Sequence, residues 1–99
     1  MLHIVNKSPF HSTSLQTCLR MAKPGSAVLL IEDGVYGATV GTSAEAMVRQ
    51  AAGALKFFAL QPDVDARGTS AKVMDGITLV DYSGFVDLTL EYSTSHSWL

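Results

Sequence analysis

The apolar run A-V-L-L-I at 27–31 restricts the fold of this chain more than any other segment. It is apolar without interruption, whereas a strand with one face in water alternates apolar and polar residues. Uninterrupted runs of this length are typical of strands that are covered on both faces. We therefore expect 27–31 to be a central strand of a parallel sheet.

Short β-type runs and helical patterns alternate along the rest of the chain. This alternation implies a small three-layer α/β/α fold with a mostly parallel sheet. At 99 residues the sequence has room for a single domain, spanning 1–99. The strands are expected at 2–5, 27–31, 54–60 and 77–80.

Polar caps and glycines mark the expected helix ends. The sequence T-S-A-E at 42–45 fits a capping box, in which the Thr42 hydroxyl and the Glu45 carboxylate each accept a backbone N–H. That helix should end at Gly53. Other helices are expected after Ser12 or Ser14 as N-cap up to Pro24, as one turn from Asp63 to Gly68, and from Asp81 or Ser83 to about Tyr92.

The composition is more apolar than that of an average soluble domain. Apolar residues make up 47% of the chain and charged residues 16%, where about 25% charged is usual. The net charge is −2 and the Lys and Arg residues are scattered, which argues against direct binding of nucleic acid. A lone cysteine and the absence of long apolar runs predict a cytoplasmic protein with no membrane span.

Cys18 is the only cysteine of the chain. It follows Leu15 by three residues and precedes Ala22 by four, so the thiol lies on the apolar face of a predicted helix. The thiol is either a small buried hydrophobic group or the chain's one soft nucleophile. We expect burial to dominate and to raise the thiol pKa, because desolvation disfavours the thiolate.

Other candidate site residues are few. His3, His11 and His96 lie at no metal-ligand spacing and are expected to be solvated, so no metal or cofactor is predicted. Asp33 and Asp81 each follow an apolar strand, which places them at the carboxyl edge of a parallel sheet, where α/β proteins form sites. Turn and helix-cap chemistry is the commoner role of aspartates in such positions.

The segment 93–99 is polar apart from Trp98 and Leu99. Terminal segments fray unless they are tied down. We expect these two large apolar residues to dock on the domain or on a neighbouring subunit, the alternative being a loose tail with a solvated indole.

Six stretches carry a resemblance to a known family: L-H-I-V-N-K-S-P-F at 2–10, S-L-Q-T-C-L at 14–19, V-L-L-I-E-D-G-V-Y at 28–36, D-V-D-A-R-G at 63–68, V-D-Y-S-G-F-V-D-L-T at 80–89 and W-L at 98–99. In this order they resemble the DsrH family, whose sister is TusB. Cys18 matches a cysteine of DsrH-type chains, so the chain resembles DsrH more closely.

The resemblance implies an auxiliary subunit of a heterohexamer, two copies each of three related α/β chains, named DsrEFH in sulfur oxidation and TusBCD in the 2-thiolation of the tRNA wobble uridine. Such complexes relay sulfur as a cysteine persulfide and need no cofactor. The implied partners are DsrE/TusD-like and DsrF/TusC-like subunits and a DsrC/TusE-like carrier. The family's principal sulfur-accepting cysteine belongs to DsrE or TusD, which leaves Cys18 as a secondary candidate persulfide carrier.

Two other functions stay open on sequence grounds. One is a free-standing persulfide sulfurtransferase that uses Cys18, and the other is a protein-interaction module unconnected with sulfur. The sequence does not separate sulfur oxidation from tRNA thiolation, identify the sulfur donor, or say which surface meets a partner.

Overall fold

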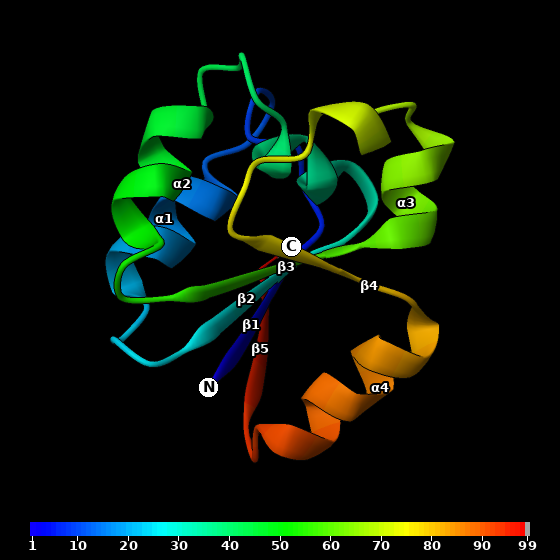
Figure 1. The fold of residues 1–99 in the computed structure, drawn as a ribbon. Helices are drawn as coiled ribbons and strands as arrows, with labels where there is room; N and C mark the ends of the chain where they lie inside the picture. The colour runs from blue at the N-terminus through cyan, green and yellow to red at the C-terminus, as the bar shows by residue number, and fades with distance from the viewer. Residues whose placement is uncertain (99) are drawn as a thin grey trace.

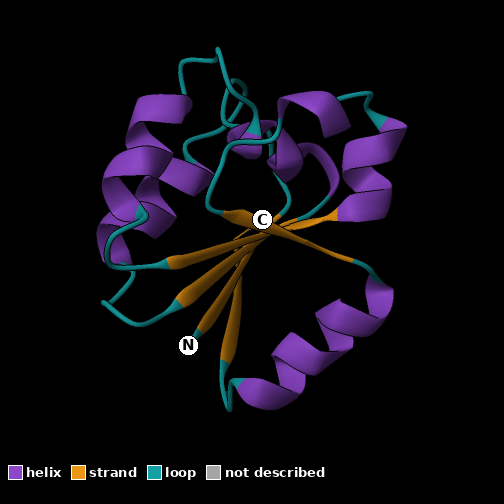
Figure 2. Ribbon diagram, in the orientation of Figure 1, coloured by secondary structure: helices purple, strands orange, loops and turns teal. Residues whose placement is uncertain are grey.

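The computed structural model describes residues 1–98. Five strands form one parallel sheet in the order β4-β3-β2-β1-β5 (Figure 1). Helices cover both faces of this sheet (Figure 2), which confirms the expected three-layer α/β/α architecture. The strands are β1 (Leu2–Val5), β2 (Ala27–Leu30), β3 (Lys56–Leu60), β4 (Ile77–Val80) and β5 (Ser95–Trp98).

The helices are divided unequally between the two faces. α1, α2 and α3 lie on one side with the 3₁₀ helix η1, and α4 lies on the other (Figure 1). The chain moves from β1 outward to β4 and then returns through α4 to the far side of β1. The helices are α1 (Ser14–Met21), η1 (Glu32–Ala38), α2 (Glu45–Ala51), α3 (Gln61–Ala66), the short 3₁₀ helix η2 (Ser70–Lys72) and α4 (Tyr82–Glu91).

β2 is the central strand, as its apolar run predicts. All of its side chains have zero solvent exposure. Val28 and Leu30 belong to the core under α1, α2 and α3, and Ala27 and Leu29 belong to the core under α4. The first core contains thirteen buried residues and the second contains four, so the α4 face is the thinner layer.

The predicted capping box of Thr42 and Glu45 is wrong. α2 begins only at Glu45, and the Thr42 hydroxyl instead donates to the carbonyl of Thr39 at 3.0 Å. The Glu45 carboxylate accepts the Gly41 N–H at 2.7 Å and pairs with Arg49 at 2.7 Å. These contacts, first the Gly41 N–H and then Arg49, lower the pKa of the Glu45 carboxyl. Glu45 thus still accepts a backbone N–H, but from Gly41 instead of Thr42, and it forms an i,i+4 ion pair in addition.

Two other expected caps have different outcomes. α1 follows Thr13, so neither Ser12 nor Ser14 is its N-cap, although the Ser12 hydroxyl accepts the Ser14 N–H at 3.1 Å. Asp81 is the N-cap of α4, and its carboxylate accepts the Gly84 N–H at 2.8 Å. The helix-cap interpretation of Asp81 is therefore confirmed.

The C-terminal segment contains a strand that the sequence analysis did not predict. β5 pairs in parallel with β1, placing His96 beside His3 and Trp98 beside Val5. The half-buried Trp98 indole donates from Nε1 to His3 Nδ1 at 3.0 Å. Docking is thus confirmed for Trp98, whereas Leu99 lies outside the described residues.

Replacing Trp98 by phenylalanine should lower the free energy of unfolding by about 1 kcal/mol, because the buried His3 Nδ1 loses its donor. In a domain of this size that corresponds to a fall in Tm of roughly 4–8 °C. Trp98→Ala should cost more, since the packing of the ring is also lost. Thermal unfolding followed by circular dichroism measures both, with Ser97→Ala on the exposed side of β5 as the control. A Trp98→Phe variant as stable as the wild type would contradict the expectation.

Candidate functional site

Polar side chains from three connections meet at the carboxyl edge of the sheet. Asn6 follows β1, Glu32 and Asp33 begin η1 after β2, and Asp63 and Arg67 lie in and after α3. The Glu32 N–H donates to Asp63 Oδ2 at 2.6 Å. Arg67 donates from Nε to Asp33 Oδ1 at 2.9 Å, and its Nη2 lies 2.9 Å from the same oxygen. A parallel sheet gathers its strand ends at one edge, which is why residues far apart in sequence form one cluster.

The turn at this edge lies very close to β1. Glu32 has a φ of 50°, which is rare for a residue other than glycine. A Cβ on Gly34 would overlap the carbonyl oxygen of Val5, so only glycine fits there. The E-D-G sequence that ends the central strand is therefore the sequence signal for this site.

A groove of about 330 Å³ lies beside the cluster, lined by Ser8, Phe10, His11, Asp33 and Tyr36. The Phe10 and Tyr36 ring centroids are 6.4 Å apart. Within residues 1–98, no hydrogen bond joins the Ser8, His11 and Asp33 side chains, and the Ser8 hydroxyl accepts the Phe10 N–H at 3.2 Å. The groove could contact another molecule through its two aromatic rings, but no base among the described residues is hydrogen-bonded to the Ser8 hydroxyl to activate it as a nucleophile.

The two predicted edge aspartates are not brought together. Asp81 is committed to the start of α4 and Asp33 to Arg67. Sequence reasoning missed Asn6, Glu32, Asp63 and Arg67 as parts of the cluster, because only the sheet topology shows that their loops are neighbours. The expected start of a helical turn at Asp63 is wrong, because α3 begins at Gln61 and Leu60 is its N-cap.

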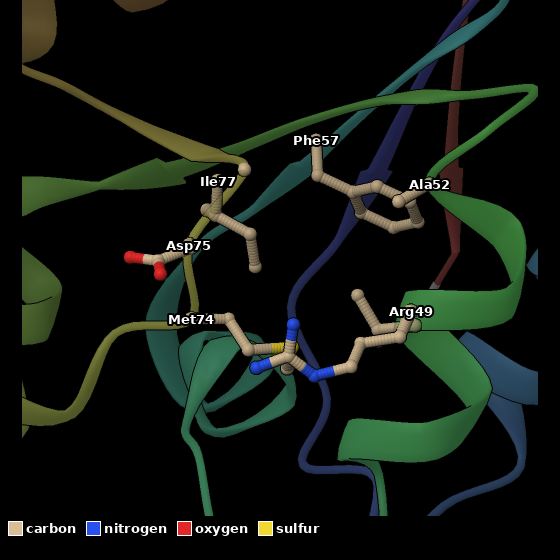
Figure 3. A pocket seen from close by; sticks show the side chains of 8 residues that line it. Arg49, Ala52, Phe57, Met74, Asp75 and Ile77 are labelled. Carbon is tan, nitrogen blue, oxygen red and sulfur yellow. The ribbon is translucent and has the colours of Figure 1, made fainter.

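A second cavity, of about 130 Å³, lies between α2 and the start of β4. Figure 3 shows Phe57, Met74 and Ile77 around it, with the Asp75 carboxylate pointing away from Arg49. Arg49 is already paired with Glu45. The cavity is smaller than the pockets of about 300–1,000 Å³ that hold small-molecule ligands.

Cys18 lies inside the larger core, with zero solvent exposure. Burial raises the pKa of its thiol to about 12, which confirms that desolvation dominates. Burial therefore disfavours the thiolate, which is the nucleophilic form of cysteine. Cys18 lines neither of the cavities described above. Its role as a persulfide carrier stays a prediction.

His3 is buried, so the expectation that it is solvated is wrong, while His11 and His96 are exposed as expected. The bond from Trp98 requires a neutral His3 ring with its proton on Nε2. Burial, then His96 and then the N-terminal ammonium lower the pKa of His3 below 6.5.

No group of three His, Cys, Asp or Glu side chains in the described part of the chain could hold a metal ion. Residues 1–98 also contain no helix with the length and apolar character that crossing a membrane requires.

The lowered His3 pKa predicts a loss of stability in acid. The unfolded chain takes up a proton near pH 6.5 that the folded chain resists, so this contribution is complete above pH 6.5 and is lost as the pH falls below it. His3→Asn keeps an acceptor for Trp98 but cannot titrate, and it should flatten the fall in Tm between pH 7 and 5. His11→Asn, at an exposed histidine, is the control. Equal slopes for wild type and His3→Asn would refute the assignment.

Comparison with known proteins adds a family and a fold. A family model described as "DsrH like protein" matches residues 7–95. The chain is 37% identical over 98 residues to Protein TusB of Pectobacterium parmentieri, covering 99% of this chain and 100% of that protein. It is 35% identical to Protein TusB of Escherichia coli, with the same coverage.

Two solved structures share the fold. The ychN protein from E. coli superposes with a TM-score of 0.82 at 20% sequence identity, covering 97% of each chain. The protein MTH1491 from Methanobacterium thermoautotrophicum superposes with a TM-score of 0.74 at 17% identity, covering 97% of this chain and 95% of that one. At these identities the similarity establishes the architecture.

Proposed function

The chain belongs to the DsrH/TusB family, and from this we propose that it is an accessory subunit of a cytoplasmic sulfur-relay complex of the DsrEFH/TusBCD type. The observation that carries the proposal is the match to TusB proteins, at 37% identity over 98 residues. Because the match spans nearly the whole of both chains, it supports a shared role rather than a shared fragment.

The partners in this proposal are one DsrE/TusD-like and one DsrF/TusC-like subunit. Large apolar side chains left exposed on this chain support an incomplete surface, since obligate interfaces are more apolar than free ones. These side chains are Met1, Phe10, Met21, Tyr82, Val86 and Leu90.

The chemistry of the complex is persulfide transfer to a DsrC/TusE-like carrier. An acceptor thiolate attacks the outer sulfur of a donor persulfide, a new S–S bond forms, and the donor leaves as a thiolate. The step has no net oxidation or reduction. It needs an accessible thiolate, whereas Cys18 is buried and its burial raises the pKa of the thiol. This supports placing the accepting cysteine on a partner subunit and argues against a free-standing sulfurtransferase.

The pathway we propose is 2-thiolation of the tRNA wobble uridine, because the relatives that match along their full length carry the TusB name. Sulfur oxidation is the second candidate, favoured by the presence of Cys18 at a position where DsrH-type chains have a cysteine.

Assembly tests the proposal most directly. Expressed alone, the chain should self-associate or be poorly soluble, because its exposed apolar residues lack partners. Co-expression with the two paralogous chains from the same genome should yield one complex by size-exclusion chromatography with light scattering. A soluble monomer that does not bind the paralogues would refute the subunit role.

Cys18→Ser should leave most sulfur transfer intact. The complex is loaded with persulfide, and arrival of sulfur on the downstream carrier is followed by mass spectrometry, together with the 2-thiouridine content of tRNA in cells. We expect less than a tenfold change in rate, which is about 1.4 kcal/mol of barrier. A larger loss with assembly unchanged would make Cys18 a persulfide carrier. Substitution of the partner's accepting cysteine is the positive control.

A further inference from the structure

The outward side of α4 carries a row of large apolar side chains. Tyr82, Val86 and Leu90 are spaced four residues apart and are 63%, 55% and 78% exposed. Residues at this spacing form one ridge along a helix surface. The inner face of α4 is apolar as well, since Leu88 and the half-buried Phe85 pack on the sheet. The helix therefore has a second apolar face that no described residue covers.

The layer around α4 is incomplete as well. Figure 1 shows α4 on the opposite side of the sheet from the other helices, with its outer surface free. On that side of the sheet, Thr78 of β4 and Ser95 and Ser97 of β5 are exposed. The described residues therefore leave part of this sheet face, beside α4, in contact with solvent.

The charge next to the ridge has one sign. Asp87 and Glu91 are exposed and four residues apart, and at 100° per residue they form a row along one flank of the apolar ridge. Every Lys and Arg of the chain precedes Val73, whereas four of its nine acidic residues follow it. α4 thus presents an apolar ridge with an acidic border and no basic residue.

This charge pattern selects the occupant. Two copies of α4 packed ridge to ridge would bring the acidic borders together if antiparallel and would leave them without a basic partner if parallel, and like charges across an interface are unfavourable. A helix whose apolar ridge is bordered by Lys or Arg would bury the same apolar surface and pair with Asp87 and Glu91. Ridges at i, i+4, i+8 are also the pattern by which one helix docks on another.

We propose that the Tyr82–Val86–Leu90 ridge of α4, with its Asp87–Glu91 border, is the docking surface for a helix with a basic border on one of the two paralogous α/β subunits. The partner's identity as a paralogous subunit rests on the proposed function. The surface itself is argued from exposure, spacing and charge.

The test uses the complex formed by co-expression of the full chain with both paralogues. Val86→Ser/Leu90→Ser removes two of the three apolar side chains of the ridge, and Asp87→Lys/Glu91→Lys reverses the charge of the border. All four residues are exposed, so the fold should survive, which circular dichroism checks. Each double variant should weaken association at least tenfold by analytical ultracentrifugation. The affinity of the charge-reversal variant should also depend less on salt concentration than the affinity of the wild type does.

Matched controls lie on another helix. Ala66→Ser alters an exposed apolar residue of α3, and Asp65→Lys reverses an exposed acid of the same helix; both should have smaller effects than the α4 variants. If the wild type assembles and both folded α4 variants bind equally well, the docking surface is refuted while the proposed function stands. If the wild type does not bind the paralogues at all, the proposed function fails, and the assignment of the partner fails with it.

Discussion

β2 can lie in the middle of the sheet only if both of its faces are kept from water, since none of its side chains is exposed. Burying one such aliphatic side chain contributes about 1.5–3 kcal/mol, against a total stability of about 5–15 kcal/mol for a typical domain. Leaving Ala27 and Leu29 uncovered would remove a large part of that margin. The crossing of α4 to the second face follows from this requirement.

The same crossing places the C-terminal strand. α4 crosses the second face of the sheet and returns the chain to the edge of β1 that does not pair with β2. There β5 completes the order β4-β3-β2-β1-β5. Trp98 then meets His3, ninety-five residues away in sequence. The burial of His3 and the docking of Trp98 follow from the pairing of β5 with β1 at the edge of the sheet. Neither could be inferred from the residues next to them in sequence.

This difference explains what could be predicted from the sequence. Local apolar patterns located β1 to β4, although β3 begins at Lys56, two residues later than expected. The burial of Cys18 followed from its helical spacing, and all these features depend on the nearest residues. β5 has the sequence S-H-S-W, with no apolar alternation, and its pairing with β1 is supplied by tertiary structure. The capping box at Thr42 was wrong because α2 begins only at Glu45 and the Thr42 hydroxyl donates to the Thr39 carbonyl, and the edge cluster around Arg67 requires knowledge of which loops are neighbours.

The distribution of chemistry over the molecule agrees with an accessory role. The one thiol is enclosed in the larger core, and the edge carboxylates of Asp33 and Asp63 are engaged by Arg67 and by the Glu32 N–H. Of the six large apolar side chains that are exposed among residues 1–98, three lie on α4, the helix that covers the smaller core. The smaller core is covered by α4 alone. A partner helix packed on the α4 ridge, as proposed, would add a further layer over this core, and assembly would thereby stabilise the folded chain.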